Sequence, residues 1–91
     1  MIRVEEPKIS NWIDARKLAE KEVEKRLNGK IKDSWVDSIW LAPYSEGSKW
    51  IVKLKVVVSK GLSGKKGYSV YVKLDPLTGE VEDFQSSEQV G

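Results

Sequence analysis

Any chemistry must come from a short inventory of side chains, because the 91-residue chain contains neither histidine nor cysteine. The commonest general base, the thiolate nucleophile and the usual zinc ligands are therefore missing. A hydroxyl beside an amine remains as a source of nucleophilic catalysis, in the pairs Ser48 with Lys49 and Ser59 with Lys60 and in Ser63 near Lys65. Serine and lysine are ordinary residues of turns, so these pairs do not indicate an enzyme. Because the usual metal ligands are missing as well, the sequence predicts no enzyme, no metal site and no cofactor.

Three carboxylates near the C-terminus are the next candidates for chemistry. Glu80, Glu82 and Asp83 are close enough in sequence to supply a carboxylate pair for glycoside hydrolysis. A short edge strand offers no pocket that would separate their pKa values. We interpret these charges as protection of a sheet edge against aggregation.

A glycine-rich segment, Gly61–Gly67, contains G-x-x-G and Gly-Lys. It has neither the spacing of a phosphate-binding P-loop nor the flanking helices of a KH-type loop. We interpret Lys60–Gly67 as a flexible hairpin tip between two strands. An apolar residue at such a tip sometimes marks a contact site, so Leu62, Lys65 and Lys66 are candidate interaction residues.

The composition indicates one small folded domain covering residues 1–91. Hydrophobic residues make up 40% of the chain and the net charge is +2, too small to indicate a nucleic-acid partner. The middle of the chain is mildly basic and its C-terminal part is acidic. Enrichment in lysine and glutamate without cysteine is typical of a thermophilic source.

No targeting or membrane segment is expected. The N-terminus lacks the apolar stretch of a signal peptide, so we expect a cytoplasmic protein if Met1 is the native start. No apolar run approaches the roughly 18 residues that cross a bilayer, so we expect no membrane contact.

A helix over residues 11–28 is the clearest element. Apolar residues recur at helical spacing from Trp12 to Leu27, with Ala15 and Ala19 in the stripe. Ser10 and Asn11 are good N-caps, and Asn28-Gly29 is a common helix end. The two alanines favour a close approach to a partner surface, for which a sheet is the natural candidate.

After Gly29 the apolar period changes from 3.6 to 2, which predicts an antiparallel β-meander over residues 32–85. With an extended lead-in at residues 1–9 and a frayed tail at 86–91, the expected fold class is α+β, one N-terminal helix packed on four strands. The predicted strands are Lys32–Ala42, Lys49–Lys60, Tyr68–Asp75 and Glu80–Gln85.

Alternation assigns residues to the two faces of this sheet. Trp50, Val52, Leu54, Val56 and Val58 are expected to face inward, as are Tyr68, Val70, Val72 and Leu74. The candidate interaction residues on the outward face are Ile51, Lys53, Lys55, Val57, Tyr71 and Lys73. Such a half-apolar face could pack against a second copy, bind a protein partner, hold single-stranded nucleic acid or stay in solvent.

The four tryptophans divide between core and surface. Trp12 and Trp50 fall on inward faces, so we expect both in the core. Trp35 and Trp40 differ by five positions and point to opposite faces of a regular strand, unless a bulge intervenes. We favour Trp40 inward, which leaves Trp35 as the candidate interaction anchor.

The expected order of elements, a helix followed by a four-stranded meander, is the cystatin-like arrangement. The stretch Tyr68-Ser-Val-Tyr-Val-Lys-Leu-Asp-Pro-Leu-Thr-Gly-Glu-Val81 resembles the closing hairpin of PepSY-type domains. The PepSY resemblance implies modulation of peptidases and a location mostly outside the cytoplasm. Cystatins insert a Q-x-V-x-G hairpin, but Val57–Gly61 matches only its final glycine, so no inhibitor residues are assigned.

The sequence therefore leads to one principal hypothesis and two alternatives. The principal hypothesis is a non-enzymatic module that acts through protein contacts, with a homodimer as one form. The first alternative is a peptidase-modulating domain of PepSY or cystatin type that uses the Lys60–Gly67 tip. The second is a weak binder of single-stranded nucleic acid that uses Lys53, Lys55, Tyr71 and Lys73.

Overall fold

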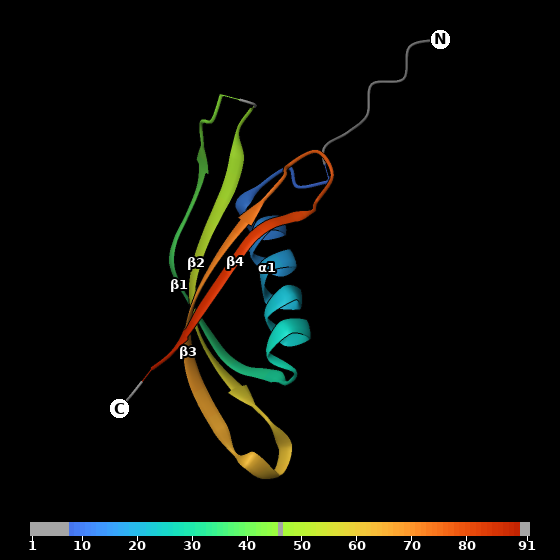
Figure 1. The fold of residues 1–91 in the computed structure, drawn as a ribbon. Coiled ribbons are helices and arrows are strands. Elements are labelled where there is room, and N and C mark those ends of the chain that lie inside the picture. The colour runs from blue at the N-terminus through green and yellow to red at the C-terminus, as the bar shows by residue number, and fades with distance from the viewer. Residues whose placement is uncertain (1–7, 46, 90–91) are drawn as a thin grey trace.

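The computed structural model describes residues 8–45 and 47–89, in which one helix packs against a four-stranded antiparallel sheet. The elements are α1 (Trp12–Leu27), β1 (Lys30–Ala42), β2 (Lys49–Ser59), β3 (Lys65–Leu74) and β4 (Val81–Glu88). The strands lie in the order β1-β2-β3-β4, so strands that are consecutive in sequence are neighbours (Figure 1). The predicted α+β fold, a helix on a four-stranded meander, is confirmed.

Two asparagines define the ends of α1. The side chain of Asn11 accepts a hydrogen bond from the backbone N–H of Asp14 at 3.0 Å, as an N-cap does. Asn28 takes the left-handed conformation (φ 52°), and its N–H donates to the carbonyl of Glu24. A Cβ at Gly29 would lie 2.6 Å from the Ser59 carbonyl oxygen, so only glycine fits this approach to β2.

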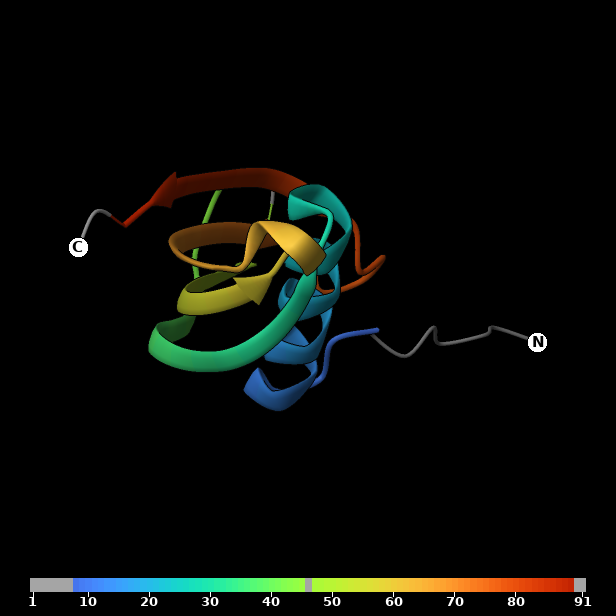
Figure 2. The same cartoon turned by 90° about the horizontal axis from the view of Figure 1, so that it is seen from below.

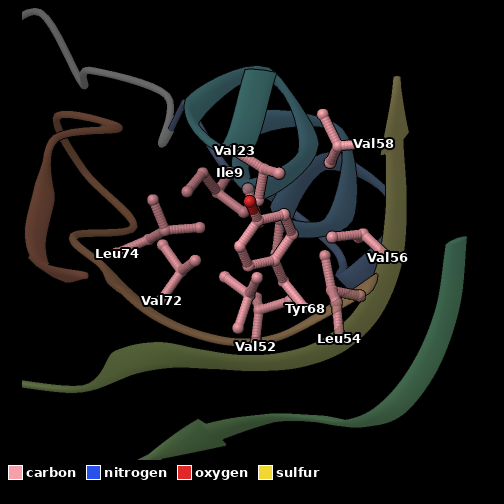
Figure 3. Close-up of a cluster of buried hydrophobic side chains, with 12 residues drawn as sticks. Ile9, Val23, Val52, Leu54, Val56, Val58, Tyr68, Val72 and Leu74 are labelled. Atoms are coloured by element: carbon pink, nitrogen blue, oxygen red, sulfur yellow. The ribbon is translucent and has the colours of Figure 1, made fainter. Parts of the chain in front are cut away.

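The core lies between α1 and one face of the sheet, which we call the inner face. Ala15, Ala19 and Val23 are fully buried on the helix, and the two alanines let it lie close to the strands. The strands contribute Val52, Leu54, Val56 and Val58 from β2 and Tyr68, Val70, Val72 and Leu74 from β3 (Figure 3). Apart from Trp50, which is half-buried, the predicted inward residues of these strands are all in the core.

Ile9 joins this core although the sequence placed it in an extended lead-in. Its side chain is only 2% exposed, and its N–H donates to the carbonyl of Pro76 at 3.1 Å. The chain before α1 is thereby attached to the turn between β3 and β4. The rest of the predicted lead-in, apart from Lys8, lies outside the described residues.

Three strand ends differ from prediction by more than one residue. β1 begins two residues earlier than expected, and β3 begins at Lys65 instead of Tyr68, so Lys65 and Lys66 belong to a strand. The loop predicted over Lys60–Gly67 is reduced to a short 3-10 turn at Gly61–Ser63. Residues 86–88, predicted to fray, pair with β3. The ladder continues through polar residues because backbone groups, not side chains, form it.

The turn between β3 and β4 is organised by Asp75. Its Oδ1 accepts hydrogen bonds from the N–H groups of Leu77 (2.8 Å) and Thr78 (3.2 Å). Its Oδ2 accepts one from Lys49 Nζ at 3.1 Å, and Lys49 also donates to Glu82 at 2.9 Å. These contacts tie the start of β2 to the turn and to β4.

The helix covers the inner face only. In the view from below, the strands curve beside α1 and no described element lies on their other side (Figure 2). We call that second side the outer face. Among residues 8–45 and 47–89, no helix is long and apolar enough to cross a membrane.

Candidate functional site

A bulge in β1 places two tryptophans on the outer face. Trp35 pairs with Lys55, and Trp40 pairs with Ile51. Residues directly opposite in an antiparallel pair share a face, and Lys55 and Ile51 lie on the same side of β2. The register shifts between Val36 and Ser38, so β1 has one extra residue there. This extra residue brings Trp35 and Trp40 to the same face of the sheet. The prediction that Trp40 faces inward is therefore wrong.

Two tyrosines join these tryptophans. Tyr44 follows β1, and the ammonium of Lys73 lies 4.3 Å from the centre of its ring. Tyr71 lies in the middle of β3, paired with Lys53. The exposed fractions are 55% for Trp35, 42% for Trp40 and 39% for Tyr44, so three large rings are open to solvent on one face.

The lysines of the outer face lie close to the rings. Lys53 Nζ is 5.7 Å from the centre of the Trp40 ring, within the range of a cation–π contact. Lys53 and Lys55 are exposed and Lys73 is half-buried. Burial raises the pKa of Tyr71, and the nearby Tyr44 hydroxyl, which hydrogen-bonds with it, raises the pKa further. The Tyr71 phenol thus stays neutral well into the alkaline range.

The two aliphatic candidates of this face are less available than predicted. Ile51 is only 2% exposed, because it lies in the ladder between Trp40 and Lys73, whose side chains share its face. Val57 is half-buried. Ile51 is therefore corrected from a contact residue to a buried one, and the exposed apolar surface comes from the aromatic rings.

A shallow groove crosses the centre of the outer face. It has a volume of about 260 Å³ and draws its lining from all four strands. Its polar lining comprises Asp37, Lys53, Ser69, Tyr71, Gln85, Ser86 and Ser87. Because it offers an acid, a base, hydroxyls and an amide, the groove can both donate and accept hydrogen bonds.

Charges on the outer face follow the strand order. Around the groove, the central strands carry Lys53, Lys55 and Lys73, whereas the edge strands carry Asp33 and Asp37 on β1 and Asp83 on β4. Lys30 and Lys65 lie further along the same face, at the ends of β1 and β3 near the hairpin tip. The middle of the face thus has a basic centre between acidic edges.

The hairpin tip presents one exposed apolar side chain. Leu62 is fully exposed within the 3-10 turn, as the sequence predicted. Lys66 lies 3.6 Å from Glu88 in an exposed ion pair, and Lys60 Nζ is 5.4 Å from the centre of the Tyr68 ring. The tip is separate from the aromatic surface on β1.

Lys49, one of the residues considered for catalysis, is engaged in other contacts. Lys49 is 7% exposed, and its hydrogen bonds to Glu82 and Asp75 raise its pKa. A higher pKa keeps the amine protonated, which is the opposite of what a general base beside Ser48 requires. Within the described parts of the chain, no three acidic side chains gather as a metal site.

Sequence reasoning missed Trp40, Tyr44 and Asp37 as surface residues. The signal available was the odd spacing of Trp35 and Trp40 around the polar pair Asp37-Ser38. A bulge was considered, but nothing in the pattern fixed its position. Trp12, predicted to lie in the core, is 51% exposed at the first turn of α1.

Comparison with known proteins finds no matching protein family, no similar curated protein and no similar solved structure. The likeness to PepSY-type and cystatin-like domains stays a prediction. Function must be argued from the surface itself.

Proposed function

We propose that this domain is a non-enzymatic interaction module that binds a protein partner through the outer face of its sheet. The observation that carries the proposal is the gathering of Trp35, Trp40 and Tyr44 on a face that no described element covers. Large exposed aromatic groups are costly to leave in water and are the residues that most often dominate protein interfaces.

The surroundings of these rings also suit a protein partner. The groove beside them is lined by both charged and neutral polar groups, which matches the polar rim of a typical interface. Trp35 and Trp40 are placed on a continuous strand, so their backbone is ordered before binding. Little conformational entropy is then lost on association.

Binding of single-stranded nucleic acid is the second candidate. The sequence pattern assigns two aromatic residues to the outer face, Trp35 and Tyr71, and four aromatic rings on a lysine-bearing sheet are a better stacking platform than two. However, Asp33 and Asp37 on one edge and Asp83 on the other oppose a polyanion. The balance of charge favours a protein.

Peptidase modulation through the Lys60–Gly67 tip is supported only by the exposure of Leu62. It predicts that Leu62→Ser changes the rate of a peptidase treated with the domain. Equal rates with the parent domain and the variant, across a panel of peptidases, would remove this alternative.

Site-specific photo-crosslinking tests the proposed surface. A photoreactive amino acid replaces Trp40 on the outer face or, as the matched control, exposed Leu77 in the β3–β4 turn. We expect the Trp40 position alone to capture a defined protein from extracts of the source cells. That protein, once purified, should bind Trp35→Ala with at least tenfold lower affinity.

Identical captures from both positions, or equal binding of Trp35→Ala, contradict the proposal. A parallel titration with a single-stranded oligonucleotide follows the tryptophan fluorescence at low salt. A salt-sensitive signal that is lost in Trp35→Ala would show that the outer face binds single-stranded nucleic acid.

A further inference from the structure

We infer that the outer face takes a second copy of this chain, with the strands of the two sheets crossing at nearly right angles. This inference rests on the proposed function, because it names the partner for the same surface. Three observations support it: the shape of the face, the arrangement of its charges and its area.

The shape of the outer face is that of a saddle. Along the strands the sheet bends around α1, which makes the outer face convex in that direction (Figure 1). Across the strands it is hollowed, because the central groove is lined from β1 through to β4. Two identical saddles fit when one is turned by about 90°, which is the orthogonal packing known for sheets.

The charges fit the same crossing. With the sheets crossed, the central strands of one copy run toward the edge strands of the other. Lys55 and Lys73, which lie on either side of the groove on β2 and β3, then approach β1 and β4 of the second copy. Those edge strands carry Asp37, which lines the groove, and Asp83, which lies opposite Lys73 of its own copy. Each copy supplies both the lysines and the acids, as a two-fold interface requires.

Packing the two sheets with their strands aligned fits the shape and charges of the outer face less well than the crossed arrangement. In one aligned arrangement, with the two-fold axis across the strands, Lys53 of one copy lies over Lys53 of the other. With the axis along the strands, the hollow of one copy lies over the hollow of the other and leaves the groove unfilled. The crossed arrangement avoids both problems.

The area predicts a weak dimer. Four strands spaced about 4.8 Å apart span roughly 20 Å, so two crossed sheets overlap over a square of about that side. Allowing for the relief of side chains, this buries about 500 Å² on each copy, near the lower limit of a specific interface. We therefore expect reversible association with a Kd of tens of micromolar.

Charge-reversal variants test the crossing. Lys55→Glu with Lys73→Glu makes the outer face acidic, and Asp37→Lys with Asp83→Lys makes it basic. By sedimentation from about 1 µM to 1 mM, the parent chain should dimerise and each variant alone should bind itself at least tenfold more weakly. An equimolar mixture of the two variants should form a one-to-one heterodimer. Thermal unfolding checks that each variant is folded.

A helix-face control separates specific contact from general attraction. Lys17→Glu with Lys21→Glu changes the net charge as much as the acidic variant does, but on the solvent side of α1. Mixed with the basic variant, it should give no heterodimer. If a variant fails to fold, Trp35→Ser serves in its place, because it should also weaken self-association at least tenfold.

A parent chain that stays monomeric to about 1 mM overturns this inference, as does a dimer unaffected by the outer-face charges. These failures leave the proposed function standing if the Trp40 photo-crosslink still captures a different protein. If the Trp40 and Leu77 positions capture the same proteins, the proposed function fails as well.

Discussion

The inner and outer faces of one sheet use the same strands for different purposes. On the inner face of β2, Val52, Leu54, Val56 and Val58 are each at most 1% exposed beneath the helix. On the outer face of that strand, Lys53 and Lys55 alternate with them and are exposed. A strict period of two therefore lets each face change with little effect on the other.

The largest expected effect lies on the inner face. Leu54→Ala removes a fully buried side chain from the centre of the core and should cost about 3 kcal/mol of unfolding free energy. Its neighbour gives the matched control, because Lys53→Ala on the outer face should change stability by less than about 0.5 kcal/mol. Urea unfolding followed by tryptophan fluorescence measures both. Equal losses would contradict the division into two faces.

Gly29→Ala should destabilise next most strongly. The added Cβ would lie 2.5 Å from Val58 Cγ1 and 2.6 Å from the Ser59 carbonyl oxygen, so α1 or β2 must shift. We expect a loss of about 1–3 kcal/mol, as in other overpacked sites. Gly67→Ala is a control for general loss of glycine flexibility, because its added Cβ would make only ordinary contacts at 3.8 Å or more and its φ is not positive. A neutral Gly29→Ala would show that the helix end is looser than described.

The ion pairs of Lys49 with Asp75 and Glu82 should make the free energy of unfolding depend on pH in the acid range. The hydrogen bond from Lys49, followed by those from the Leu77 and Thr78 amides, lowers the pKa of Asp75 below its ordinary 3.8. A carboxyl whose pKa is depressed by folding stabilises the fold above its unfolded pKa. That stability is lost as the pH falls from about 3.8 through the folded value.

Asp75→Asn should therefore lower the melting temperature by roughly 5 °C at pH 7 and reduce the difference between pH 7 and pH 3. Thermal unfolding of parent and variant at both pH values measures this. The same difference in both proteins would assign the acid sensitivity to another carboxylate.

On the outer face, Trp35→Ser should leave stability within about 0.5 kcal/mol of the parent, because Trp35 is more than half exposed. Binding to a partner or a second copy should nevertheless fall at least tenfold. A large loss of stability without loss of binding would mean that Trp35 serves the fold.

The smallest effect is spectroscopic. Burial raises the pKa of Tyr71, so an alkaline titration of this phenol should show it ionising above the ordinary pKa of a tyrosine. Tyr71→Phe should remove this late step, and Tyr44→Phe should move it to lower pH because Tyr44 contributes to the shift. A Tyr71 phenol with an ordinary pKa would contradict the Tyr44–Tyr71 contact.

Much of the fold could be predicted because local signals were strong. Asn11, Asn28 and the alanine stripe indicated the helix, and the alternation from Val52 to Leu74 indicated the inner face. The bulge at Asp37 could not be located from the sequence, because it is defined by the pairing of β1 with β2 and has no local turn motif. That single residue reverses the face of Trp40.

Exposure was harder to predict than direction. Trp12 lies at the end of the helical stripe but remains half exposed in the first turn of α1. Ile51 points outward but is buried among longer neighbours. The strand period sets the direction of a side chain, whereas the size of the neighbouring side chains sets its exposed fraction. The sequence therefore predicted the position of the candidate surface, its lysines and two of its four aromatic residues, Trp35 and Tyr71, but not Trp40 or Tyr44.

The four indole N–H signals report whether the outer face is the contact surface between two copies of the chain, because Trp35 and Trp40 lie on that face and Trp12 and Trp50 do not. Two-dimensional NMR spectra of the chain are recorded from about 50 µM to 1 mM, a range that spans the expected Kd. We expect the Trp35 and Trp40 signals to shift with concentration while those of Trp12 and Trp50 stay fixed. Movement of Trp12 and Trp50 with the outer pair unchanged would contradict it.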